Sequence, residues 1–122
     1  MTGKRRQRWR DYQTASGRRP VKQFIDGLTD AETAAVVAGM KEVATRGLGC
    51  ARHVRGDIYE VRADVNRRCF RILFAQETKF ILLSLSGFPK TSQKTPSDEL
   101  ELAETRLHDW RERGRRRWRE PS

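Results

Sequence analysis

The chain has 122 residues, a formal net charge of +10, and 34% charged against 36% hydrophobic residues, which fits one polar domain with a modest core. No stretch is apolar enough to span a membrane, and the basic N-terminus runs into Asp11-Tyr12-Gln13, so we expect neither a membrane helix nor a secretory signal. Two cysteines make neither a disulfide framework nor a metal site, which favours a reduced, cytoplasmic protein without a cofactor.

The positive charge is concentrated at the two ends of the chain. Residues 1–10 contribute +5 and residues 111–122 contribute +4, which leaves +1 for the rest. Such ends attract phosphate without regard to sequence, or they are only solvated charge runs, and composition leaves both interpretations open. We expect one domain over residues 1–114, with a basic N-terminal segment, and a frayed basic tail over 115–122.

The first third of the chain predicts one strand and two helices. Residues 8–12 alternate between large or aromatic and charged side chains, as in a strand. Pro20 suits the first position of a helix that ends near Gly27. Thr29 and Glu32 have the spacing of a capping box for a second helix, which ends near Gly47. Each helix has one apolar face, so the pair forms a helical hairpin that needs a sheet to pack on.

A loop over residues 48–55 precedes two strands at 57–62 and 68–74, joined by the turn residues 64–66. The short turn implies an antiparallel hairpin. Alternation places three bulky side chains on one face, where they would pack on the helices: Phe70, Ile72 and Phe74. Three charged side chains then emerge together on the opposite face: Glu60, Arg62 and Arg71.

Residues 80–85 are nearly all apolar and predict a central strand buried on both faces, which the Gly87-Phe88-Pro89 segment ends. Thr95 suits the N-cap of a C-terminal amphipathic helix, with Pro96 at its first position. The predicted fold is a small α+β domain. It has an antiparallel sheet of about four strands, an N-terminal helical hairpin and a C-terminal helix.

Few residues are suited to acid–base or metal chemistry. His53 and His108 are isolated, and no cluster has metal-ligand spacing, so we expect no metal. Glu60 is a single carboxylate that serves as a general base or, more simply, pairs with a neighbouring arginine.

The strand arginines are the sharper signal. Arg62 and Arg71 interrupt apolar strands, where a charge is costly unless it faces solvent or a partner. Guanidinium groups bind phosphate and stabilise the charge of a phosphorane-like transition state. Lys90 and Lys94 lie on the segment after the central strand, and Phe88 beside them could stack on an RNA base. A salt-bridged sheet surface with a basic loop explains the same spacing equally well.

Four segments in this order resemble the RelE/HigB toxin superfamily of bacterial toxin–antitoxin systems, in particular its phage-derived, HigB-like branch. The segments are Ile58-Tyr59-Glu60-Val61-Arg62, Phe70-Arg71-Ile72-Leu73-Phe74, Leu83-Ser84-Leu85-Ser86-Gly87-Phe88-Pro89-Lys90 and Gln93-Lys94-Thr95-Pro96. The resemblance covers residues 8 to 110 and implies a RelE-like fold. The order of the motifs together is fairly specific, whereas any one alone would be weak.

The resemblance implies a ribosome-dependent endoribonuclease that cuts mRNA in the ribosomal A site without a metal. The 2′-hydroxyl attacks the adjacent phosphate and leaves a 2′,3′-cyclic phosphate and a 5′-hydroxyl. It also implies contact with rRNA and a cognate HigA-like antitoxin with a helix-turn-helix domain. The toxin would meet operator DNA only through that antitoxin.

Carried over by position, the resemblance implies that Arg71 stabilises transition-state charge, that Arg62 holds the substrate phosphate, and that Lys90 belongs to the catalytic set. Lys94 and Phe88 would contact or shape the RNA site. Ser86 and Glu60 complete the predicted RNA-contacting residues. The branch often has a histidine at the position of Ser86, and Thr91 replaces the second lysine of a pair, so the proton carriers are unassigned.

Two other functions fit the same sequence. The ParE branch of this superfamily acts on DNA gyrase rather than RNA, and fold alone does not separate the branches. A non-catalytic RNA- or rRNA-binding module, with the basic ends supplying the affinity, is the third possibility.

Overall fold

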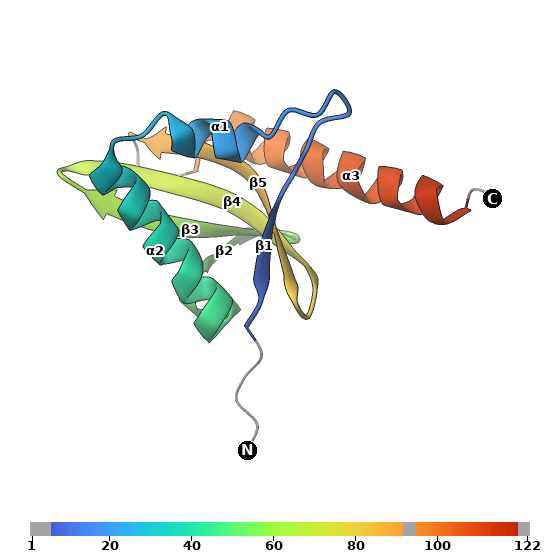
Figure 1. The fold of residues 1–122 in the computed structure, drawn as a ribbon, viewed down its shortest axis with the longest axis horizontal. Coiled ribbons are helices and arrows are strands. Elements are labelled where there is room, and N and C mark those ends of the chain that lie inside the picture. The colour runs from blue at the N-terminus through green and yellow to red at the C-terminus, as the bar shows by residue number, and fades with distance from the viewer. Residues whose placement is uncertain (1–5, 92–94, 120–122) are drawn as a thin grey trace, which may run out of the picture.

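Five strands form one sheet in the order β1-β5-β4-β3-β2 in the computed structural model (Figure 1). The structure describes residues 6–91 and 95–119, with side chains described up to residue 114. In chain order the elements are β1 (Arg8–Asp11), α1 (Pro20–Asp26), α2 (Asp30–Arg46), the 3-10 turn η1 (Leu48–Cys50), β2 (Arg52–Arg55), β3 (Ile58–Val65), β4 (Arg68–Thr78), β5 (Ile81–Lys90) and α3 (Ser97–Arg119).

The sheet is mixed, which corrects the prediction of about four antiparallel strands. β2 to β5 form an antiparallel meander, but β1 pairs with β5 in parallel. Sequence alternation reveals a strand but not the direction of its distant neighbour, so the parallel pair was not foreseen. β2 lies within the predicted loop. It is an edge strand of four residues with a single apolar member, Val54, and therefore has almost no periodic signal.

The turn between β3 and β4 sets the register of the central hairpin. Asn66 and Arg67 both have positive φ, at 52° and 65°, as in the two-residue turns whose twist matches that of paired strands. This turn places Arg62 directly opposite Arg71.

The prediction that Gly87-Phe88-Pro89 ends the central strand is wrong, because β5 continues to Lys90. β1 covers β5 only as far as Ser84, so Pro89 lies where one edge of β5 has no neighbouring strand. Proline is tolerated there because its missing N–H removes no ladder hydrogen bond.

The two N-terminal helices follow the predicted pattern. Pro20 occupies the first turn of α1, and both hydrogen bonds of the predicted capping box begin α2, at 2.9 and 3.2 Å between Thr29 and Glu32. They pack chiefly on the sheet rather than on each other: α1 lies on β5 and α2 on β3. A Cβ built on Gly87 would lie 2.5 Å from Cδ2 of Phe24, so the glycine allows α1 to approach β5 closely.

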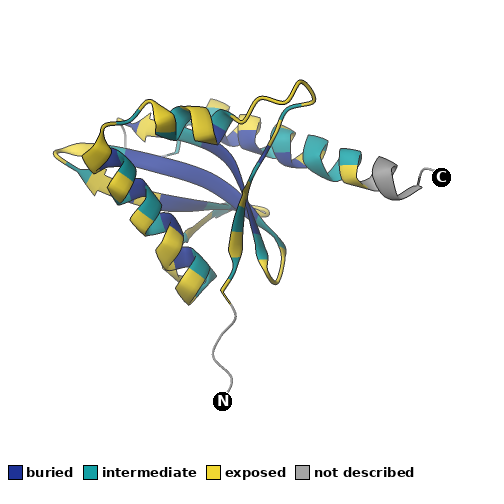
Figure 2. Cartoon of the chain, in the orientation of Figure 1, coloured by how far each residue is buried: buried dark blue, intermediate teal, exposed yellow. Residues whose placement is uncertain are grey.

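Apolar side chains fill both faces of the sheet, and the central strands are largely buried (Figure 2). The predicted face of Phe70, Ile72 and Phe74 does pack under the helices, together with Val21, Val36, Met40, Val43 and Leu82. The opposite face forms a second core beneath α3, made by Tyr12, Ile58, Leu73, Ala75, Leu83, Leu85, Phe88, Leu100, Ala103 and Leu107. Burial of β5 on both faces is thus confirmed for its central residues, whereas Phe80 lies in a turn and is 43% exposed.

α3, the predicted amphipathic helix, docks on the sheet through Leu100, Ala103 and Leu107, and its C-terminal part extends past the sheet (Figure 1). Tyr12 Oη donates a 2.6 Å hydrogen bond to Asp109 and ties the helix to the end of β1. The helix begins at Ser97 rather than after a Thr95 cap, and it continues through Gly114 to Arg119. In the described part of the chain, no helix combines the length and apolarity needed to cross a membrane.

Candidate nucleic-acid interface

Four positively charged residues lie on adjacent strands of the sheet face that α3 partly covers. They are Arg52 on β2, Arg62 on β3, Arg71 on β4 and Lys90 on β5, and we call them the cationic group. Arg62 pairs directly with Arg71. Lys90 pairs with Cys69, two residues before Arg71, and Arg52 pairs with Glu60, two residues before Arg62. Because residues two apart share a face, all four side chains belong to one face. The predicted grouping of Arg62 and Arg71 on one face is therefore confirmed.

The predicted open surface is wrong for part of this group. Arg71 is 3% exposed and Lys90 is 7% exposed, whereas Arg62 lies at the surface. Glu60 shares their face as predicted but is fully buried. Thr95 bonds to Glu60 on this face and Glu99 of α3 accepts a bond from Ser86, long-range contacts that strand alternation does not reveal. The cationic group thus has a buried half and an exposed half.

Arg71 is fixed in place by two carboxylates and a backbone carbonyl. Its Nη1 donates to the Phe70 carbonyl at 2.9 Å and to Asp64 Oδ1 at 3.2 Å. Its Nε lies 3.6 Å from Glu60 Oε1, an ion pair too long for a hydrogen bond. Glu60 Oε2 accepts a 2.7 Å hydrogen bond from Thr95, which explains why the Thr95 hydroxyl does not cap α3.

Three polar atoms of this region are buried without a hydrogen-bond partner among the described residues: Glu60 Oε1, Arg71 Nε and Lys90 Nζ. Burial lowers the pKa of Lys90, and Glu60 opposes this by favouring the ammonium ion. The three arginines of the cationic group lower that pKa further, so all four cations share one electrostatic environment. A buried amine with a lowered pKa and no hydrogen-bond partner is chemically suited to exchange a proton.

Asp64 and Cys69 form the rim beside Arg71. The Cys69 thiol, followed by Arg71, holds the pKa of the Asp64 carboxyl below its usual range. Asp64 pairs with Cys69 across β3 and β4, and Cys69 in turn pairs with Lys90. This rim balances part of the charge of Arg71 and leaves Arg62 as the exposed cation directly opposite it.

Ser86 and Phe88 are not placed to contact RNA in this structure. Ser86 is 2% exposed and its Oγ donates to Glu99 on α3 at 2.9 Å. Phe88 is 6% exposed and packs in the core beneath α3, so the predicted stacking on a base is wrong for this arrangement. Both residues instead hold α3 against β5. Lys94 lies outside the described residues.

Arg52 is the member of the cationic group that sequence reasoning missed. It lies opposite Glu60, and its Nη1 is 4.0 Å from Glu60 Oε1. The turn residue Gly56, at φ 55° between β2 and β3, was the available signal for a hairpin.

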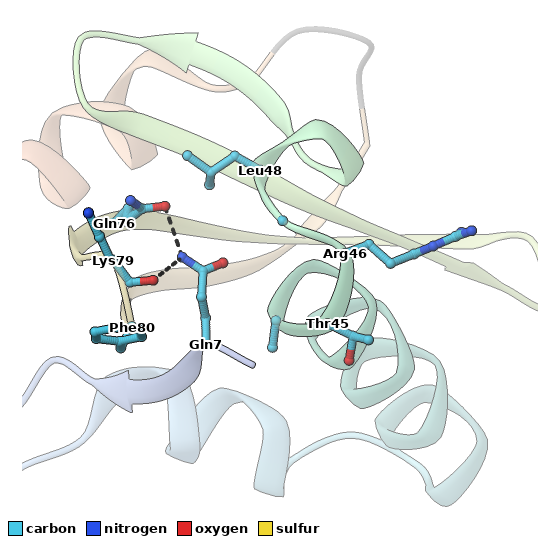
Figure 3. Close-up of a pocket in the computed structure, with 9 residues that line it drawn as sticks. Gln7, Thr45, Arg46, Leu48, Gln76, Lys79 and Phe80 are labelled. Atoms are coloured by element: carbon cyan, nitrogen blue, oxygen red, sulfur yellow. Dashed lines mark hydrogen bonds between the residues drawn. The ribbon is translucent and has the colours of Figure 1, made fainter. Parts of the chain in front are cut away.

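A hollow of about 450 Å³ lies elsewhere, between the C-terminal end of α2, the chain before β1 and the β4–β5 turn (Figure 3). Gln7 spans it and donates to Gln76 and to the Lys79 carbonyl at 2.9 and 3.2 Å. It shares no residue with the cationic group. Across the described residues no set of three His, Cys, Asp or Glu side chains is arranged to hold a metal ion.

The fold and this face define a small α+β protein that gathers positive charge from four neighbouring strands, an arrangement suited to a polyanion. Residues 23–108 match the family model described as phage derived protein Gp49-like. The chain is also 32% identical over 106 residues to the protein named "Probable endoribonuclease HigB1" in two strains of Mycobacterium tuberculosis, CDC 1551 / Oshkosh and ATCC 25618 / H37Rv, covering 84% of each chain. The chain belongs to the Gp49-like family and is a RelE/HigB-like toxin, as its motifs predicted.

Proposed function

We propose that this toxin is a metal-independent endoribonuclease that cuts mRNA on the ribosome and so inhibits translation. The observation that carries the proposal is the cationic group, which combines two buried cations with two exposed ones on a single face. The relatives named as probable endoribonucleases support the same chemistry.

In the proposed reaction the 2′-oxygen attacks the adjacent phosphorus, and the bond from phosphorus to the 5′-oxygen breaks. One proton leaves the 2′-hydroxyl and another reaches the departing 5′-oxygen. Arg62 holds the phosphate at the surface, and Arg71 stabilises the additional negative charge of the transition state. Lys90 is the proton carrier, because the Lys90 amine is buried and has a lowered pKa. Ser86 is unsuited to this role. Contact between the phosphate and either buried cation requires the surrounding side chains to move.

The proposed partners follow from the toxin class. We propose a cognate HigA-like antitoxin with a helix-turn-helix domain, operator DNA reached only through it, and mRNA with rRNA as the target. Lys94 is proposed to contact RNA. The proposed catalytic domain is residues 1–114, with residues 115–122 as a basic extension.

Mapping RNA 5′ ends after inducing the protein tests this function. We expect new ends in register with codons of translated messages, and the same cuts on purified ribosome complexes when the toxin has been treated with EDTA and desalted before it is added. The paired change Glu60→Gln with Arg71→Gln and the single change Lys90→Met should each abolish these ends. Arrested growth with intact mRNA and damaged DNA would contradict the proposal and favour a gyrase target. RNA binding without cleavage would favour a non-catalytic module.

A further inference from the structure

The two exposed members of the cationic group are both neighbours of the buried carboxylate Glu60. Arg52 stands opposite Glu60 on β2, and Arg62 stands two residues beyond Glu60 on β3. The two arginines are therefore diagonal neighbours on one sheet face, with Cα atoms about 7–8 Å apart. Arms of that length bring two guanidinium groups within reach of one phosphate.

Neither guanidinium is fully engaged within the protein. The ion pair from Arg52 to Glu60 is 4.0 Å long, and the Arg52 side chain is 52% exposed. A long, exposed ion pair contributes little stability. Arg62 is exposed and makes no ion pair among the described residues. It also faces Arg71, and Asp64, whose charged form both arginines favour, offsets only part of the repulsion between the two opposed cations. An anion bound beside Arg62 would relieve that repulsion.

The cationic group runs diagonally across the sheet from Lys90 on β5 to Arg52 on β2. Three strand spacings separate its ends, about 14 Å across the sheet. The buried end holds the residues proposed to act on the reacting phosphate, and the exposed end lies on an edge strand. A surface of this extent exceeds what a single phosphate can occupy.

We propose that Arg52 and Arg62 form a phosphate subsite that binds the RNA backbone next to the phosphate being cleaved, on the side of the edge strand β2. This subsite rests on the proposed endoribonuclease function. In it Arg62 lies between the two phosphates, and Arg52 is a positioning residue that contacts only the neighbouring one. RNA then crosses the strands from β2 towards β4 rather than running along them.

The change Arg52→Gln tests this subsite, and Arg46→Gln is its matched control. Arg46 is also an exposed arginine with a loose ion pair, 3.7 Å to Glu42, but it lies at the end of α2 on the other face. The probe is a single-stranded oligoribonucleotide with methylated 2′-hydroxyls, which cannot be cleaved, bound at several salt concentrations. A cleavable message on ribosomes gives KM and kcat separately.

We expect Arg52→Gln to weaken binding of the probe roughly tenfold at low salt and to lower the salt slope by about 0.7, the amount for one phosphate contact on a single strand. KM should rise with kcat unchanged, Arg52→Lys should restore part of the affinity, and Arg46→Gln should match the wild type. Equal behaviour of Arg52→Gln and Arg46→Gln would overturn the subsite, as would a fall in kcat at unchanged KM. If the wild type binds the probe but does not cut the message on ribosomes, the endoribonuclease proposal fails. The effect of Arg52→Gln on probe binding then still decides whether the subsite exists.

Discussion

Glu60 and Arg71 form a buried ion pair across β3 and β4, with Oε1 and Nε 3.6 Å apart and side chains 0% and 3% exposed. A buried ion pair holds two charges that are costly to separate once the protein has folded. Any change to one partner therefore alters stability as well as chemistry.

We predict that Arg71→Ala lowers the free energy of unfolding by about 3–5 kcal/mol, because it leaves the Glu60 carboxylate buried without its arginine. Combining Glu60→Leu with Arg71→Met should recover most of this loss, since apolar side chains of similar size avoid the desolvation cost. Urea unfolding followed by circular dichroism measures both. Exposed Arg62→Ala is the control and should stay within about 0.5 kcal/mol of the wild type. Equal losses for Arg71→Ala and Arg62→Ala would contradict the prediction.

Lys90→Met should stabilise the protein, with a pH dependence set by the lowered pKa of Lys90. The folded protein holds this proton less tightly than the unfolded chain, whose lysine has the ordinary value of 10.5. Below the lowered pKa, the charged amine therefore reduces the free energy of unfolding by its full amount. This reduction disappears as the pH rises to 10.5. Unfolding curves of both proteins should converge over that window. A difference that grows with pH would rule out this account, and exposed Lys41→Met serves as the control.

Gly87→Ala should destabilise the fold by roughly 1–3 kcal/mol, as overpacking does. The added methyl group meets Phe24 of α1 and Ile72 of β4, at 2.5 and 3.0 Å from its position. Gly49→Ala is the matched control, because nothing lies within 4 Å of the methyl group added there. Thermal unfolding compares the two, and equal midpoints would show that α1 shifts away from β5 without cost.

Ending the chain after Gly114 should weaken RNA binding without changing the cleavage pattern. The missing residues 115–122 carry four arginines and one glutamate. Attraction by such charges is independent of sequence, so the loss of affinity should be greatest at low salt. A changed cut-site preference would contradict this division of roles.

An earlier end point would confuse that test. Arg111 bridges Asp57 and Glu77, each at 2.9 Å, so removing it also loosens the contact between α3 and the sheet. The truncation after residue 114 keeps both ion pairs.

The period-2 pattern of the strands predicted correctly which side chains share a face, because alternation is a local property of the chain. It placed Phe70 under the helices and Arg62 beside Arg71. Burial of Phe88 depends on α3, and Thr95 bonds to Glu60 beside Arg71, so a distant part of the sequence packs on that face. Local patterns hold no information on such packing, so the exposed half of the candidate site was predictable and the buried half was not.

Arg52 shows a second limit of sequence patterns. The strand that carries it has four residues, three of them polar or charged, and no alternation that separates it from a loop. Its position opposite Glu60 arises from the hairpin with β3, which the isolated segment does not specify.

The parallel pairing of β1 with β5 has a consequence for how the toxin is made. Arg8 lies beside Ile81, so β1, the first strand to be synthesised, has no neighbouring strand until β5, the last one, has been made. Contacts so distant in sequence form late in folding, and Thr95, which bonds to Glu60 beside Arg71, is made later still. In a nascent chain stopped at Thr78 the only strands that have their neighbours are those of the β2–β3–β4 meander, and Lys90 is missing. Under the proposed function, we therefore expect each newly made molecule to be inactive towards the ribosome that is synthesising it.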